Sequence, residues 1–177
     1  MTNFKGSKTE NNLKAAFAGE SQACMKYQYY ASKAKKDGYI KISQIFEETA
    51  KNEKEHAKIW FKKLHDNTVP DTASNLKDAI SGEHYETSTM YQEFAKQARE
   101  EGFNDIAQLF EMVGAIEAQH EQRYQELLEE VTSGAIFKQP QEVYWICTNC
   151  GHVVKGNEPP AKCPVCAHER AYFVRKN

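Results

Sequence analysis

The sequence has no excess of charge of one sign and no long apolar segment. Lysine and arginine number 23 against 25 aspartates and glutamates, which gives the 177-residue chain a net charge of -2. Because the two signs are interspersed, no basic stripe predicts a nucleic-acid partner or an anionic membrane surface. No apolar run approaches the roughly 20 residues that a membrane helix needs, and the polar start lacks the hydrophobic centre of a secretory signal. We therefore expect a cytoplasmic protein that binds neither nucleic acid nor membrane.

Proline is missing from two long stretches that are rich in alanine, glutamate, lysine and glutamine. Such composition favours helices, and Gly38, Gly102 and Gly134 mark where helices end. Apolar residues within the stretches recur at spacings of three, four and seven, as on the core-facing side of a helix. The sequence thus predicts a mainly α fold, a four-helix bundle. The expected helices are Thr9 to Asp37, Ile40 to about His65, Ser74 to Glu101 and Asn104 to Val131.

The two halves of the predicted bundle resemble each other. The segment that begins Tyr27-Gln28 recurs at Tyr91-Gln92, 64 positions later, and Gln44-Ile45-Phe46-Glu47 recurs as Gln108-Leu109-Phe110-Glu111 at the same offset. Upstream, Gly19-Glu20 matches Gly82-Glu83 with an offset of 63. One residue has therefore been gained within the third helix, and a π-bulge absorbs such an insertion at least cost. We expect the bulge between Glu83 and Tyr91.

The composition changes after Gly134, which predicts a second, small domain. Residues 135–142 contain Gln139-Pro140-Gln141 and are expected to form a linker after a bundle of residues 1–134. Residues 143–177 combine β-prone segments with four cysteines. A segment this short cannot build an adequate hydrophobic core without a cross-link or a metal. We therefore expect a bound metal to hold it together.

Glutamate and histidine recur at metal-ligand spacing in both halves. Residues three apart share one face of a helix, so Glu53 with His56, and Glu117 with His120, can each converge on one point. A single Glu-x-x-His arises easily in a charged helix, and a solvated surface is then the simpler interpretation. Two pairs at equivalent positions, each with a glutamate on the preceding helix, match the di-iron and di-manganese carboxylate bundles. The sequence predicts a dimetal centre, which suits iron or manganese, with the ligands Glu20, Glu53, His56, Glu83, Glu117 and His120.

Glu86 breaks the repeat, because the first half has alanine at the equivalent place. We expect it to face the site as a seventh, exchangeable ligand, although a surface glutamate is the alternative. Tyr27 and Tyr91 lie in mid-helix near the ligands and could hydrogen-bond the coordinating carboxylates, or simply belong to the core. His84 has no match in the repeat and is assigned to the surface, and Cys24 is left without a role.

Two Cys-x2-Cys motifs, Cys147 with Cys150 and Cys163 with Cys166, are separated by twelve residues. Four thiolates make a closed tetrahedral site, which suits structural zinc or an iron that carries one electron. Spacing alone does not choose between the two metals. A neighbouring dimetal centre that must be reduced favours iron, with zinc as a possible substitute.

These motifs together resemble the rubrerythrin family, in which a ferritin-like di-iron bundle precedes a rubredoxin-like domain. The resemblance extends over essentially all of the chain. It implies a peroxidase that reduces hydrogen peroxide to water, with electrons from a reduced pyridine nucleotide that pass through a separate reductase and often through rubredoxin. No dinucleotide-binding glycine motif occurs in the sequence, which fits an external electron donor. The resemblance also implies that one iron leaves His56 for Glu86 on oxidation.

Other functions remain open from the residues alone. The bundle ligands also allow a ferroxidase or iron-storage protein, although the cysteine-rich tail argues against storage. A noncatalytic module with a zinc ribbon is a third possibility. Because a closed thiolate site cannot touch substrate, the tail must dock near a dimetal centre. We expect a homodimer in which the tail of one subunit reduces the bundle of the other.

Overall fold

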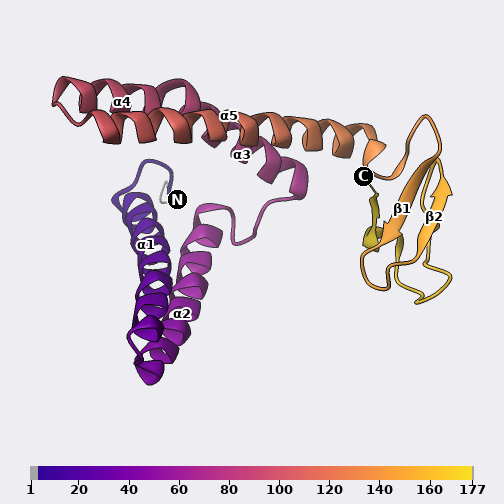
Figure 1. The fold of residues 1–177 in the computed structure, drawn as a ribbon, viewed down its shortest axis with the longest axis horizontal. Helices are drawn as coiled ribbons and strands as arrows, with labels where there is room; N and C mark the ends of the chain where they lie inside the picture. Colours follow the sequence, from indigo (N-terminus) through magenta and orange to yellow (C-terminus); the bar gives the residue numbers. More distant parts are fainter. Residues whose placement is uncertain (1–3, 177) are drawn as a thin grey trace. The chain divides into compact units, whose positions relative to one another are not determined.

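The computed structural model describes residues 4–176, which form two compact units, one up to Pro70 and one from Asp71 onward (Figure 1). The first unit is a hairpin of two antiparallel helices, α1 (Lys8–Lys36) and α2 (Ile40–Leu64). The Ser7 side chain caps α1 by accepting a hydrogen bond from the backbone N–H of Glu10. Four small buried residues line the contact and let the two helices approach closely: Ala31, Ala34, Ala50 and Ala57.

The second unit begins with a longer hairpin. Its first arm runs through α3 (Thr72–Tyr85), a π-helical segment (Glu86–Met90) and α4 (Tyr91–Glu100), and its second arm is α5 (Asn104–Ser133). Figure 1 shows α3 and α4 lying along α5. The π-helical segment lies between Glu83 and Tyr91, so the position predicted from the repeat is confirmed.

The sequence repeat is also a structural repeat. In the first hairpin the Tyr27 and Phe46 rings lie 5.9 Å apart at 35°, and in the second the Tyr91 and Phe110 rings lie 6.0 Å apart at 36°. Each pair is joined by a third aromatic ring at the same offset, Tyr30 or Phe94. The two hairpins therefore hold their helices together with the same aromatic cluster.

A three-stranded antiparallel sheet forms the C-terminal part of the second unit. The strands β1 (Val143–Cys147), β2 (Val153–Gly156) and β3 (Phe173–Arg175) are arranged in the order β2-β1-β3. Short 3-10 turns occur at Ala135–Phe137 and Arg170–Tyr172. The core of the sheet domain is small and consists of four buried residues: Trp145, Cys147, Cys163 and Phe173. Two of these are cysteines of the predicted metal site, so this core and the site are one structure.

Residues 135–142, the expected linker, are hydrogen-bonded to the sheet domain. The Gln139 N–H donates to the Asn157 carbonyl at 2.8 Å, and the Asn157 side-chain amide donates to the Gln139 carbonyl at 3.0 Å. Arg175 of β3 also pairs with Glu130 near the end of α5. These contacts tie the sheet domain to the preceding helix.

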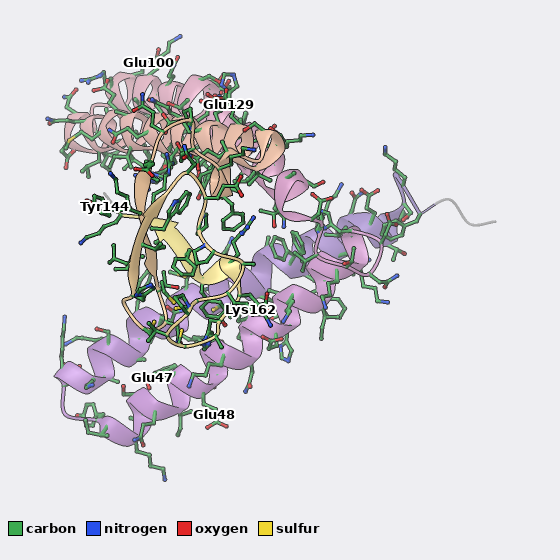
Figure 2. The ribbon with its side chains drawn as sticks, turned by 90° about the vertical axis from the view of Figure 1, so that its right-hand side faces the viewer. Glu47, Glu48, Glu100, Glu129, Tyr144 and Lys162 are labelled. Atoms are coloured by element: carbon green, nitrogen blue, oxygen red, sulfur yellow. The ribbon has the colours of Figure 1, made fainter. Side chains whose placement is uncertain are left out.

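The helices carry their charges outward. The labelled glutamates Glu47 and Glu48 on α2, Glu100 on α4 and Glu129 on α5 are exposed and extend away from their helices (Figure 2). Among the described residues, no helix combines the length and apolar character needed to cross a bilayer. The predicted fold class, mainly α with a small β domain at the C-terminal end, is confirmed.

Candidate metal centres

The first hairpin brings three of the predicted ligands together. Glu20 comes from the middle of α1, and Glu53 and His56 come from consecutive turns of α2. His56 Nδ1 lies 2.8 Å from a carboxylate oxygen of Glu53 and 3.8 Å from one of Glu20. One donor atom of each residue lies within 4.8 Å of the other two. The helical spacing of three residues therefore produces the convergence that the sequence predicts.

The second hairpin repeats this arrangement. His120 Nδ1 lies 2.6 Å from a carboxylate oxygen of Glu117 on the same helix and 3.8 Å from one of Glu83 on α3. The three donor atoms again lie within 4.8 Å of one another. The two clusters thus match to within about 0.2 Å in their histidine–carboxylate distances, as their shared sequence pattern requires. Each hairpin carries half of the six-ligand set that the sequence predicts.

The charged groups of the second cluster shift the pKa of Glu83 in opposite directions. Burial raises the pKa of Glu83, and the negative charge of Glu117 raises it further, while His120 counteracts part of this effect. Glu86 also raises the pKa of Glu83, so its carboxylate lies within electrostatic reach of the cluster. A divalent cation among these groups would stabilise the ionised carboxylates, because an unpaired buried charge is costly.

Glu86 begins the π-helical segment, and Tyr91 directly follows it. Glu86 is its first residue and is half-buried, and it is not one of the three residues whose donor atoms converge. Desolvation raises the pKa of Tyr91, and the nearby charges of Glu86, Glu117 and Glu83 raise it further. Tyr91 therefore lies beside the carboxylates, as expected of a group that supports the ligands.

The four cysteines converge at the end of the sheet. Cys147 Sγ lies 3.7 Å from Cys166 Sγ, and Cys150 Sγ lies 3.6 Å from Cys163 Sγ. Four thiolates bound at about 2.3 Å in a tetrahedron would have sulfurs roughly 3.8 Å apart, so the observed spacing fits a tetrahedral ion. All four sulfur atoms lie within 4.8 Å of one another.

The two cysteine loops share the same backbone hydrogen bonds and a positive φ angle at the same position. The N–H groups of Cys147 and Cys163 donate to the carbonyls of His152 and His168, each at 2.8 Å. In each loop a second N–H donates to the carbonyl of the first cysteine, from Gly151 to Cys147 and from Ala167 to Cys163. Gly151 and Ala167 have positive φ angles of 77° and 60°. The sequence motif Cys-x2-Cys therefore forms two equivalent tight turns that aim their sulfurs at one point.

Backbone hydrogen bonds to two of the sulfurs lower the pKa values of their thiols. The N–H of His168 lowers the pKa of Cys166 to about 6. The N–H of His152 likewise lowers the pKa of Cys150, but the neighbouring thiols, Cys166 first, outweigh it and raise that pKa to about 12. The hydrogen bond from His168 thus favours the thiolate form of Cys166, and a bound metal ion would favour the thiolate form of all four cysteines.

The donor sets of both kinds of site suit metals. Ions bound at about 2.1 Å place their nitrogen and oxygen donors up to about 4.2 Å apart, close to the spacing found in each hairpin. Carboxylates with imidazole suit iron or manganese, and four thiolates suit iron or zinc. The residues present therefore fit a carboxylate and imidazole metal site in each hairpin and a mononuclear thiolate centre in the sheet domain.

One polar contact beside the second cluster was missed by the sequence interpretation. His84, which was assigned to the surface, is exposed, but its Nδ1 lies 3.1 Å from Glu121 on α5. Both residues directly follow ligands, Glu83 and His120, so this pair links the two ligand-bearing helices just beside the cluster. Adjacency to two ligands on facing helices was a signal that could have revealed it.

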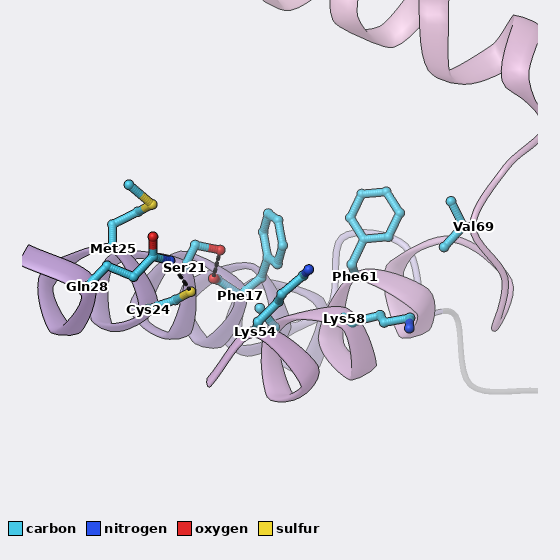
Figure 3. A pocket seen from close by; sticks show the side chains of 10 residues that line it. Phe17, Ser21, Cys24, Met25, Gln28, Lys54, Lys58, Phe61 and Val69 are labelled. Carbon is cyan, nitrogen blue, oxygen red and sulfur yellow. Dashed lines mark hydrogen bonds between the residues drawn. The ribbon is translucent and has the colours of Figure 1, made fainter. Parts of the chain in front are cut away.

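A hollow in the first unit is separate from its ligand cluster. It has a volume of about 600 Å³, and the Phe17 and Phe61 rings stand beside Lys54 and Lys58 along it (Figure 3). None of the predicted ligands lines it, although Cys24 does. The hollow therefore does not belong to the candidate metal centre.

Helical hairpins with Glu-Glu-His clusters, followed by a four-thiolate domain, define a metal protein of the ferritin-like class with a rubredoxin-like tail. The rubrerythrin family model matches residues 11–128, and the model of the rubrerythrin rubredoxin-like domain matches residues 145–174. The chain belongs to the rubrerythrin family, whose members are generally oxidoreductases.

Individual relatives are similar over nearly the whole chain. Rubrerythrin of Porphyromonas gingivalis is 46% identical over 181 residues, which cover 96% of this chain and 90% of that protein. Rubrerythrin of Nitratidesulfovibrio vulgaris is 43% identical, with 98% and 96% of the two chains covered. A solved structure of nigerythrin in a mixed-valence state is 31% identical, covers 99% of this chain and 92% of its own, and has a TM-score of 0.36.

Proposed function

We propose that this protein is a non-haem di-iron peroxidase that reduces hydrogen peroxide to water, with electrons relayed through the four-cysteine iron from an external reductase. The observation that carries the proposal is the presence, in one chain, of two matching Glu-Glu-His clusters and a closed four-thiolate site. The first kind of site would offer a substrate access to metal, whereas the second kind is closed to substrate and, with iron bound, could pass electrons.

The carboxylates and histidines have distinct tasks in this proposal. The six ligands would hold two iron ions, which would supply the two electrons that cleavage of the O–O bond requires. Glu20, Glu53, Glu83 and Glu117 neutralise the charge of the two ions and hold them close together. His56 and His120 would each supply one imidazole nitrogen to an ion, from a position one turn after a carboxylate ligand on the same helix. Reduction of one peroxide consumes two electrons and two protons and yields two waters.

Glu86 and Tyr91 adapt the site to the change in iron charge. Glu86 is the spare carboxylate beside the second cluster. The resemblance to the family implies its role, which is to take the place of His56 as a ligand when the ions become more positive. Tyr91 lies within reach of the negative carboxylates and can donate its hydroxyl proton as a hydrogen bond to one of them.

The tail returns the electrons one at a time. The Cys150 and Cys166 sulfurs accept hydrogen bonds from the backbone N–H groups of His152 and His168. These hydrogen bonds stabilise thiolate charge and would thereby influence the reduction potential of a bound iron. The donor is a rubredoxin or a pyridine-nucleotide-dependent reductase, because the chain has no nucleotide-binding motif of its own. Four free thiolates need a reducing compartment, so the proposal places the protein in the cytoplasm.

Iron loading followed by peroxide removal tests the proposal. Anaerobically loaded protein should bind three irons per chain and should remove peroxide in the presence of a reductant. Cys163→Ser should abolish the tail's visible colour and multiple turnover while it leaves the bundle irons in place. Glu117→Ala should remove bundle iron but leave the tail's colour unchanged, which makes the two variants controls for each other. Zinc alone in the tail, with no loss of turnover in Cys163→Ser, would overturn the relay.

A further inference from the structure

A hydrogen bond joins α3 to α5 directly beside the second ligand cluster. His84 Nδ1 lies 3.1 Å from Glu121 Oε1, and the same oxygen accepts the side-chain N–H of Gln125 at 3.0 Å. An ionised carboxylate can only accept hydrogen bonds, so the His84 ring donates this one. The Glu121 side chain is only 17% exposed. This pair, called the His84–Glu121 bridge below, is therefore held more firmly than an ion pair between two exposed side chains.

The bridge lies next to two of the candidate ligands. His84 directly follows Glu83 on α3, and Glu121 directly follows His120 on α5. Neighbouring residues of an α-helix belong to the same hydrogen-bonded turn. A bond that fixes the distance between His84 and Glu121 therefore also limits how far the two ligands can move apart.

The first hairpin has no such pair at the equivalent positions, although it carries a matching ligand cluster. The repeat places Ser21 at the position of His84, with an offset of 63, and Ala57 at the position of Glu121, with an offset of 64. The Ser21 hydroxyl donates to the Phe17 carbonyl of its own helix at 2.7 Å, and the alanine side chain has no polar group. Both residues instead line the hollow shown in Figure 3. The bridge thus distinguishes the second cluster from the first.

The second hairpin also gathers more negative charge at this level. After burial, the charges of Glu117 and Glu86 raise the pKa of Glu83, whereas the first hairpin has Ala23 in place of Glu86. Like charges repel one another and would drive the two arms apart. The distance from the histidine Nδ1 to the glutamate on the facing helix is nevertheless 3.8 Å in both hairpins. The second hairpin therefore keeps the same ligand spacing against a stronger repulsion.

We propose that the His84–Glu121 bridge positions two ligands, Glu83 and His120, for one ion of the dimetal centre. The bridge offsets the repulsion among the carboxylates of the second hairpin and keeps the ligand atoms within reach of a single ion. His84 and Glu121 are positioning residues, because they act through the ligands beside them. The second cluster then holds its ion more tightly than it would with the residues of the first hairpin. This inference rests on the dimetal part of the proposed function and is independent of the reaction catalysed.

Replacement of the bridge by the equivalent residues of the first hairpin tests the inference. His84→Ser with Glu121→Ala removes both partners and leaves every candidate ligand in place. Protein loaded anaerobically with ferrous iron is mixed with a chelator, and the loss of bundle iron is followed separately from the tail's absorbance. One of the two bundle irons should leave about 10-fold faster than in the wild type, as when a group that orients a metal ligand is removed. The Mössbauer spectrum of the ferrous protein should change at one bundle iron, and the tail iron should stay unchanged.

Two matched variants separate positioning from a general loss of stability. Glu121→Gln keeps an oxygen that can accept the His84 N–H, so it should retain the wild-type rate of iron loss. Glu111→Ala removes an ion pair between α4 and α5, in which Arg99 Nη2 donates to Glu111 at 2.7 Å. This pair lies six residues before Glu117, the nearest ligand on α5, so its loss should leave the rate of iron loss unchanged.

Wild-type iron loss and a wild-type spectrum in the double variant would overturn the inference. Equal acceleration in Glu111→Ala would also overturn it, because the effect would then be one of general stability. If the double variant fails to fold, His84→Ser alone provides the same comparison, since its side chain is exposed. Wild-type protein that binds no bundle iron would instead overturn the proposed function.

Discussion

The Thr87 hydroxyl donates a 2.7 Å hydrogen bond to the backbone carbonyl of Gly114 and so joins the π-helical segment to α5. At the same place α5 has no side chain, and a methyl group at Gly114 would lie 3.1 Å from Tyr91 Cβ. The equivalent position in the first hairpin, which lacks the inserted residue, is Ala50. The π-helical segment therefore brings its arm closer to α5, and glycine makes room for Tyr91.

Gly114→Ala should destabilise the second hairpin. The Tyr91 Cβ is fixed to its own backbone and cannot turn away, so the helices must separate. Overpacking costs roughly 1–3 kcal/mol, and the better helix propensity of alanine returns up to about 1 kcal/mol. We expect a net loss of about 1 kcal/mol in the free energy of unfolding, measured by thermal or denaturant unfolding of the metal-free protein. A Gly114→Ala variant more stable than the wild type would contradict this, because it would show that Tyr91 can move aside without loss of free energy of unfolding.

Glu86→Ala should impair cycling between oxidation states more than metal loading. Glu86 lies outside the converging set of three donors in its hairpin but within electrostatic reach of Glu83. The variant should keep both bundle irons and complete a first reduction of peroxide, but it should lose most of its later turnovers. Glu83→Ala, one turn earlier, is the control and should lose bundle iron. Loss of iron in Glu86→Ala as well would make Glu86 an ordinary ligand.

The two cysteine loops should respond in opposite ways to exchange of their turn residues. Ala167 has a φ of 60°, a conformation that costs a non-glycine residue about 1 kcal/mol, whereas the first loop has Gly151 at φ 77°. Ala167→Gly should therefore slow the loss of tail iron to a chelator, and Gly151→Ala should speed it. The rate of colour loss measures both. Equal rates of iron loss in the wild type and both variants would contradict the prediction and would mean that the metal–sulfur bonds, and not the turn residues, set the rate.

Asp71 should stabilise the start of α3 in a pH-dependent way. Its carboxylate accepts the Ser74 N–H at 2.9 Å, which lowers the pKa of Asp71 below its ordinary value of 3.8. Because the folded pKa is the lower one, this contribution is complete above about pH 4 and disappears as the pH falls through the folded pKa. Asp71→Ala should melt roughly 2–4 °C lower at pH 7.

The difference between wild type and Asp71→Ala should shrink below pH 4 in parallel thermal melts. Asp71→Asn is the control, because an asparagine caps the helix but does not titrate. Its melting temperature should therefore exceed that of Asp71→Ala by an amount that does not change between pH 7 and pH 3. A wild-type advantage that stays constant over this range would exclude the charge of Asp71 as its origin.

Local and periodic features could be predicted from the sequence because they depend on short-range geometry. The offset change from 63 to 64 located the π-helical segment, and the Glu-x-x-His spacing predicted which side chains would converge on each hairpin. The contact of Thr87 with Gly114 could not be predicted, since it depends on how far the insertion displaces one arm. The pair of His84 with Glu121 was missed because it joins two helices, although each residue directly follows a ligand and that adjacency could have revealed it.

The test closest to the central claim is single-turnover oxidation of the fully reduced protein, mixed anaerobically with either hydrogen peroxide or dioxygen in a stopped-flow instrument. The account predicts that the bundle irons are oxidised faster by peroxide, with one peroxide consumed per dimetal centre, because two ferrous ions supply the two electrons that O–O cleavage needs. Equal or faster oxidation by dioxygen would contradict the peroxidase and would indicate an oxidase or ferroxidase.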